Sequence, residues 1–101
     1  MDTRGLVRKS TANTPSIASD ATALAENSAR SSWSIQNLGT NTLYVLLGSG
    51  ASTSVFHYAL KAGSVNDDGT GGSVGESSGV IYTGVITIAG TSARYCVKET
   101  S

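Results

Sequence analysis

Two neighbouring segments carry the clearest pattern of hydrophobic and polar positions in the chain. In residues 33–36 (Trp-Ser-Ile-Gln) apolar and polar side chains alternate, which is typical of a strand with one face in water. Residues 43–47 (Leu-Tyr-Val-Leu-Leu) are apolar on both faces of a strand. Residues 37–41 (Asn-Leu-Gly-Thr-Asn) lie between them and favour a tight reversal. The pattern therefore predicts a β-hairpin at the centre of the fold.

The second strand of this hairpin needs a cover on each of its faces. One face packs into the core of the chain, and the other requires a second covering surface. A neighbouring subunit or a larger partner is one candidate for that cover, and a loop of the same chain is the other. We expect subunit contacts either on the face of Leu43, Val45 and Leu47 or on the opposite face of Tyr44 and Leu46.

Weaker strand patterns lie on both sides of the hairpin, at 15–18, 21–25, 55–61, 80–89 and 93–99. Residues 21–25 also fit one helical turn, because alanine favours helices and the window is short. The glycine-rich stretch 63–79 predicts a long loop, which in a compact domain is usually either functional or mobile. Together these patterns predict an all-β fold for residues 14–101, a single-domain β-sandwich or jelly roll of seven to eight short antiparallel strands.

The first thirteen residues have a different composition from the rest of the chain. They contain three basic residues, Arg4, Arg8 and Lys9, against a single acid, and few apolar residues. This composition predicts a flexible N-terminal arm over residues 1–13 that becomes ordered on a partner. A frayed terminus without a function is the alternative.

Composition and charge exclude several classes of function. The chain has 101 residues, a formal net charge of zero and only 14% charged residues. Proteins that bind nucleic acid or anionic membranes usually carry a basic excess, so we expect neither partner. A lone cysteine, Cys96, excludes an internal disulfide framework and a cysteine-rich zinc site. Because no signal peptide or long apolar run is present, we expect a soluble protein made in a cytoplasm.

Few residues offer catalytic or metal-binding chemistry. The adjacent acids Asp67 and Asp68 with Glu76 lack the alternating spacing of a calcium loop, so a solvated turn is the better interpretation. The glycine-rich run 69–73 lacks the lysine and the helix of a phosphate-binding loop. Serines are plentiful, but His57 is the only histidine, and it fits a strand residue facing solvent or an interface better than a catalytic base. We therefore expect no enzyme activity, no metal and no cofactor.

Arginine and tyrosine residues offer chemistry for binding. Arg30 lies just before the central strand, where its side chain either bonds carbonyls or carboxylates of a neighbouring loop or is exposed to solvent. Four tyrosines either line a sugar-binding face or fill the core and interfaces of a sandwich. These are Tyr44, Tyr58, Tyr82 and Tyr95.

The segment from Asn27 to Val45 resembles a pattern in small structural proteins of tailed bacteriophages. That pattern runs roughly Asn-x-x-Arg-x-x-(apolar)-x-Ile-Gln-Asn-x-Gly-x-x-x-(apolar)-Tyr-Val and is followed by a glycine near the position of Gly48. The segment 82–85 and the turn 89–91 are also similar, so the resemblance covers about residues 25–99. The long Gly/Ser loop and the basic arm depart from the pattern.

The resemblance implies a virion structural protein that is a small β-sandwich or jelly roll, often a trimer. Capsid decoration (cement) proteins, head fibres and minor tail components are of this kind. We expect a non-enzymatic cement protein on the capsid surface that binds and stabilises the shell of the major capsid protein. A receptor- or carbohydrate-binding module of a head fibre or tail is the alternative, and a hydrolase is a weaker third. The expected interface residues are Arg4, Arg8, Lys9, Arg30, Leu43, Tyr44, Val45, Leu46 and Leu47.

Overall fold

The computed structural model describes residues 7–13 and 17–100, with side chains from Ala21 onward, and this part of the chain is all-β. The described residues contain no helix. The eight strands are β1 (Val7–Asn13), β2 (Ile17–Leu24), β3 (Ser32–Asn37), β4 (Leu43–Leu47), β5 (Tyr58–Leu60), β6 (Ser73–Glu76), β7 (Ile86–Gly90) and β8 (Arg94–Thr100).

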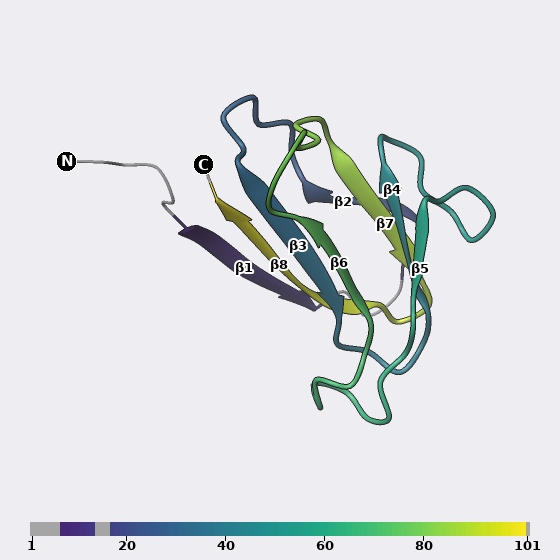
Figure 1. Cartoon of the computed structure of the whole chain (residues 1–101). Helices are drawn as coiled ribbons and strands as arrows, with labels where there is room; N and C mark the ends of the chain where they lie inside the picture. Colours follow the sequence, from purple (N-terminus) through teal and green to yellow (C-terminus); the bar gives the residue numbers. More distant parts are fainter. Residues whose placement is uncertain (1–6, 14–16, 101) are drawn as a thin grey trace.

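The strands form two antiparallel sheets of four strands each (Figure 1). The first sheet has the order β1-β8-β3-β6 and the second has the order β2-β7-β4-β5. β1 pairs with β8, β2 with β7, β3 with β6 and β4 with β5, so the two halves of the chain run alongside each other. These four pairs form one long two-stranded ribbon. The pairs β3·β8 and β4·β7 then join parts of this ribbon into the two sheets.

A single core lies between the two sheets. Alternate residues of β3 are buried, as the sequence pattern predicts, and Trp33 and Ile35 face inward. The inward residues of both sheets belong to one cluster, which makes the arrangement consistent with a β-sandwich. The buried members of this cluster are Trp33, Ile35, Leu43, Val45, Leu60, Ile86, Ile88, Ala93, Tyr95 and Val97.

The central hairpin predicted from the sequence is wrong, although its two strands exist. β3 and β4 lie in different sheets, and the connection between them crosses from one sheet to the other. The amide of Asn37 fixes this crossing, because its Nδ2 donates to the carbonyl of Asn41 (2.8 Å) and its Oδ1 accepts from the amide of Gly39 (2.9 Å). The local turn chemistry is therefore as expected, while the pairing of the strands is not.

Two segments expected to be irregular contain strands. Residues 7–13 of the expected arm form β1, which pairs with β8 at every position, and residues 1–6 lie outside the described residues. The expected loop 63–79 contains β6, which pairs with β3. A side chain at Gly75 would overlap the carbonyl oxygen of Trp33, so glycine permits this close approach. Both strands are mostly polar in sequence. β1 is held by its backbone pairing with β8, and β6 by its pairing with β3 and by Val74, which packs against the core.

Other strand boundaries differ from the sequence pattern. The short segment 21–25 extends into the longer strand β2, and the helical alternative is not adopted. The predicted strand 55–61 shrinks to β5, and the predicted strand 80–89 begins only at Ile86. Residues 80–85 instead cross the end of the sandwich, where their backbone carbonyls are bound by a buried arginine.

Candidate interaction surface

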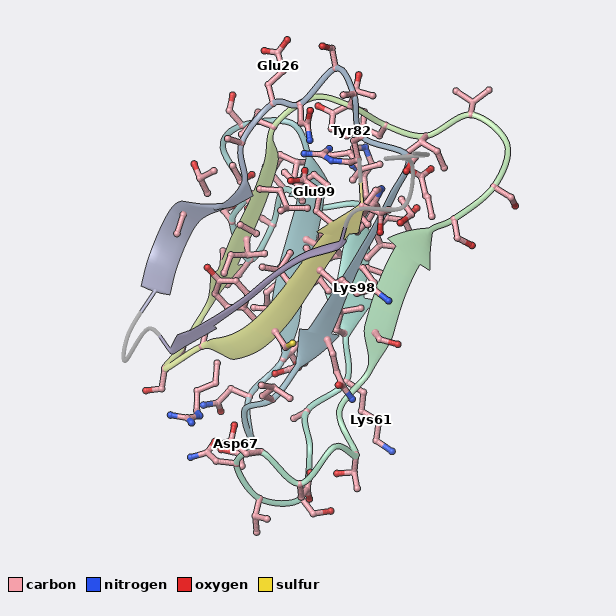
Figure 2. The ribbon with its side chains drawn as sticks, turned by 90° about the vertical axis from the view of Figure 1, so that its left-hand side faces the viewer. Glu26, Lys61, Asp67, Tyr82, Lys98 and Glu99 are labelled. Atoms are coloured by element: carbon pink, nitrogen blue, oxygen red, sulfur yellow. The ribbon has the colours of Figure 1, made fainter. Side chains whose placement is uncertain are left out.

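Arg30 is a buried structural residue and is not available to a partner. Its residue exposure is 4%, and the Nε atom donates to Oε2 of Glu99 at 2.8 Å. The Nη1 atom donates to the carbonyls of Tyr82 (2.9 Å) and Gly84 (3.0 Å), and Nη2 donates to that of Ala25 (2.7 Å). Figure 2 shows Tyr82 and Glu99 close together at this end of the molecule. Arg30 thus bonds loop carbonyls and a carboxylate, one of the two alternatives left open by the sequence, and this burial does not fit its expected place in an interface.

Glu76 fixes the same end of the sandwich. Its Oε1 accepts hydrogen bonds from the indole Nε1 of Trp33 (2.7 Å) and from the backbone amide of Tyr82 (2.9 Å). The amide of Tyr82, the indole of Trp33 and the nearby charge of Arg30 lower the pKa of Glu76 below its usual value. The Glu76 carboxylate therefore joins β6 to β3 and to the segment that precedes β7.

The opposite end is organised by Asn37, which is 1% exposed. Besides bonding its own turn, its Nδ2 donates to the carbonyls of Leu60 and Lys61, both at 3.2 Å. The backbone amide of Asn37 donates to Gly72, and the amide of Gly72 donates to Lys61. These bonds connect β6 to the end of β5 and so close the edge between the two sheets.

The acidic turn predicted to be solvated is held by its own hydrogen bonds. Both carboxylate oxygens of Asp68 accept bonds, from the amide and hydroxyl of Thr70 and from the amide of Val65. The bonds from Thr70 contribute most to lowering the pKa of Asp68 to about 2. The neighbouring Asp67 pairs with Arg94, and Figure 2 shows Asp67 at the tip of this end. Within the described residues, no group of three His, Cys, Asp or Glu side chains is placed to hold a metal ion.

Strand β4 does not present two free apolar faces. Leu43 (1% exposed) and Val45 (0%) are fully buried in the chain's own core, and Leu47 packs against that core. Their expected role in subunit contacts therefore does not agree with their burial. Tyr44 and Leu46 point to the outer side of the sheet and are half-buried.

The loop 48–57 provides part of the cover over this outer side. Thr87 pairs with Leu46 and lies on the same face, yet it is only 1% exposed. The hydroxyl of Thr87 donates to the carbonyl of Gly48 (2.7 Å) and accepts from the amide of Ala51 (3.2 Å), which is itself buried. A loop of the same chain, one of the two covers considered from the sequence, thus lies across the sheet.

The far side of the loop is fastened by His57. Its backbone amide donates to the carbonyl of Val45 at 2.8 Å, and its Nδ1 accepts from the amide of Leu47 at 3.0 Å. A ring nitrogen that accepts a backbone proton has a structural role. The only histidine of the chain is therefore an anchor of the covering loop.

Apolar side chains are exposed on this loop and at the adjoining edge of the sheet. Val55 is 52% exposed, Phe56 is 40% and Tyr58 is 37%. The rings of Phe56 and Tyr44 are in contact, with centroids 4.8 Å apart and a tilt of 52°. We call Tyr44, Val55 and Phe56 the apolar patch. Tyr58 pairs with the inward-facing Val45 and therefore lies on the other face of the sheet, at its edge. The sequence placed Phe56 and Tyr58 on one face of a strand, and no local signal shows that the segment before Tyr58 leaves the sheet.

The outer side of the other sheet is polar. Ser34 and Gln36 of β3, Ser73 of β6 and Lys98 of β8 line an open groove of about 360 Å³ together with Cys96. No aromatic side chain lines this groove. The two outer sides of the sandwich therefore differ, and the apolar patch belongs to only one of them.

The basic residues expected to contact a partner lie where the structure describes little. Arg4 is outside the described residues, and Arg8 and Lys9 are described only as backbone positions of β1, paired with Glu99 and Lys98.

The described part of the chain has no helix with the length and hydropathy needed to cross a bilayer. No family model, curated protein or solved structure matches this chain.

Proposed function

We propose that the chain is a non-enzymatic structural protein of a bacteriophage virion, a decoration protein that binds the outside of the major capsid shell and stabilises it. The observation that carries the proposal is the apolar patch, which lies on a small, tightly hydrogen-bonded β-fold. Exposed apolar clusters on small domains are typical of surfaces that bind other proteins. The resemblance of residues 25–99 to phage structural proteins supplies the kind of partner.

The order of the strands supports a jelly roll. Eight strands in which the first pairs with the last, the second with the seventh and so on form a double ribbon rolled into two sheets. Viral capsid proteins and lectins are frequent examples of this architecture. This is an argument from fold analogy, and it agrees with both a capsid protein and a carbohydrate-binding protein.

The size of the patch argues for several contacts at once. Fully burying a large apolar side chain contributes about 1.5–3 kcal/mol, so Val55 and Phe56, roughly half exposed, contribute about 1 kcal/mol each. The sum of about 2 kcal/mol is well below the roughly 8 kcal/mol of a micromolar complex. A decoration protein of this size therefore needs further contacts and the avidity of an oligomer. The basic residues Arg4, Arg8 and Lys9 are candidates for those contacts.

Binding to undecorated capsids of the virus that encodes the chain tests this proposal. Purified protein is mixed with the capsids, and co-sedimentation and the temperature of capsid disruption are measured. The double variant Val55→Ser/Phe56→Ser removes about 2 kcal/mol of apolar burial and should weaken binding about 30-fold. Val80→Ser is the matched control, since Val80 is 94% exposed and outside the patch. Failure of the unmodified protein to bind would remove the proposal.

The basic segment is tested in the same assay. Deleting residues 1–13 would also remove β1, so replacing Arg4, Arg8 and Lys9 by serine is the sharper change. A contribution of these residues to binding should appear as weaker co-sedimentation and a smaller dependence on salt. If this variant binds capsids at low salt as tightly as the unmodified protein does, the basic residues do not contribute and the apolar patch is the contact.

The second candidate function is carbohydrate binding on a fibre or tail. The contact between the rings of Tyr44 and Phe56 favours it, since sugars bind on exposed aromatic rings. The tilt of 52° between Tyr44 and Phe56 makes a flat stacking surface less suitable, so we rank this function second. Saturable binding in a glycan titration that is lost in Phe56→Ala, without binding to capsids, would reverse the ranking.

A further inference from the structure

We propose that two copies of the chain join through their β1 strands, edge to edge and antiparallel, so that the two four-stranded sheets become one continuous sheet. This inference concerns the isolated protein and does not depend on capsid binding. It replaces the trimer implied by the resemblance with a two-fold pair. The geometry of the four edge strands leads to it.

Three of the four edges of the sandwich are poor templates for another strand. β5 has three residues and β6 has four, and the bonds through Gly72 connect these two edges to each other. β2 is longer, but its pairing with β7 shifts register twice, between Ile17 and Ala21 and between Thr22 and Leu24. Short edges and bulges are devices that prevent pairing with another chain.

The edge formed by β1 is neither short nor bulged, and its two charged residues, Arg8 and Lys9, both lie in its first half. It pairs with β8 at seven consecutive positions without a register shift, and it is the outermost strand of its sheet (Figure 1). At about 3.3 Å per residue, the strand offers roughly 23 Å of regular backbone. Alternate residues of such a strand direct their N–H and C=O groups away from β8. Among the described residues, no strand pairs with that side.

If a second copy pairs with β1, the positions of the charges favour the antiparallel over the parallel direction. The register that pairs all seven residues is centred on Ser10 and places Arg8 opposite Ala12 and Lys9 opposite Thr11. The basic half of one strand thus faces the uncharged half of the other. A parallel arrangement in register would place like charges side by side, which destabilises a sheet. Isologous contacts of this kind are the commonest way to form a homodimer.

One repulsion between the two chains remains in this arrangement, and it makes the pairing depend on salt in a way that can be measured. The two Lys9 residues are diagonal neighbours across the centre of the contact, within the roughly 7–8 Å of diagonal cross-strand pairs. Added salt screens charges at this separation, because the Debye length is about 10 Å at 0.1 M ionic strength. The pair should therefore become tighter when salt is raised.

Sedimentation equilibrium of the purified full chain over a wide concentration range tests the proposal. We expect a reversible equilibrium between one and two chains. Thr11→Glu places a carboxylate opposite Lys9 of the other copy and should lower the dissociation constant about 2- to 30-fold, because symmetry gives two such pairs. Thr11→Lys should raise it by a similar factor. Ser73→Glu and Ser73→Lys, on the β6 edge of the same sheet, should leave it unchanged.

A charge reversal distinguishes the contact between chains from an effect within one chain. Lys9→Glu combined with Thr11→Lys restores opposite charges across the two-fold axis and should recover the pairing that Thr11→Lys loses. Thermal unfolding at concentrations below dissociation checks that each variant is folded. A monomer at all concentrations, a mass of three chains, or equal dissociation constants for Thr11→Glu and Thr11→Lys would each overturn the proposal.

Discussion

Removing the guanidinium of Arg30 should cost more stability than any other single surface or loop substitution in this chain. The Arg30 side chain is 0% exposed, and the carboxylate-bearing side chain of Glu99 is 13% exposed. In Arg30→Ala, Glu99 loses its charge partner, and the carbonyls of Ala25, Tyr82 and Gly84 lose their donor. Breaking a buried ion pair on one side costs about 3–5 kcal/mol.

That loss is a large share of the total stability of a small domain, which is about 5–15 kcal/mol. At about 4–8 °C for each kcal/mol, the melting temperature should fall by about 12–40 °C. Arg30→Lys keeps the charge but not the planar fork that reaches four acceptors, so its loss should be intermediate. The assay is urea unfolding at one fixed protein concentration, with the free energy extrapolated to zero urea.

Arg94→Ala is the matched control for this substitution. Arg94 also pairs with a carboxylate, that of Asp67, but the two side chains are 29% and 50% exposed. A pair with this exposure is screened by water and contributes less than about 1 kcal/mol. Equal losses for Arg30→Ala and Arg94→Ala would refute the conclusion that Arg30 holds the crossing loops together.

Two further predictions concern the same framework. The folded-state pKa of Glu76 lies below its usual 4.5, so its carboxylate stabilises the fold above that pH and ceases to do so as pH falls through the folded value. The difference in unfolding free energy between the unmodified protein and Glu76→Gln should therefore shrink between pH 7 and pH 3; a constant difference would contradict it. Gly71→Ala should cost about 1–3 kcal/mol, because the new methyl overlaps the carbonyl oxygen of Asn37. Gly39→Ala, whose nearest contact would be 3.4 Å, should cost less in the same urea unfolding assay.

The candidate surface shows where reasoning from the sequence succeeded and where it stopped. The doubly apolar segment 43–47 was correctly identified as needing a cover on both sides. The cover on its outer side comes partly from loop 48–57, which nothing in the polar composition of residues 49–54 indicates. The apolar groups that remain exposed, Val55 and Phe56, lie on the covering loop. Which apolar side chains are exposed depends on which loop packs over the sheet, and that is a property of the tertiary fold.

Arg30 makes the same point for a charged residue. Its position before a strand was compatible with solvent or with loop carbonyls, and the sequence alone did not choose between them. Its acceptors are the nearby residue 25 and three residues more than 50 positions away, 82, 84 and 99. Only the folded chain brings them within the reach of one guanidinium.

The sequence by itself determined the all-β class, the inward face of β3 and the turn chemistry around Asn37. Alternation of side chains and local hydrogen bonds are properties of a few consecutive residues, so they are readable from a short window. The tertiary structure decided that β3 and β4 lie in different sheets, that the polar segments 7–13 and 73–76 are strands, and which apolar groups face solvent. Those outcomes depend on backbone hydrogen bonds and packing between residues distant in the chain, and a polar strand acquires its identity only from the neighbour with which it pairs.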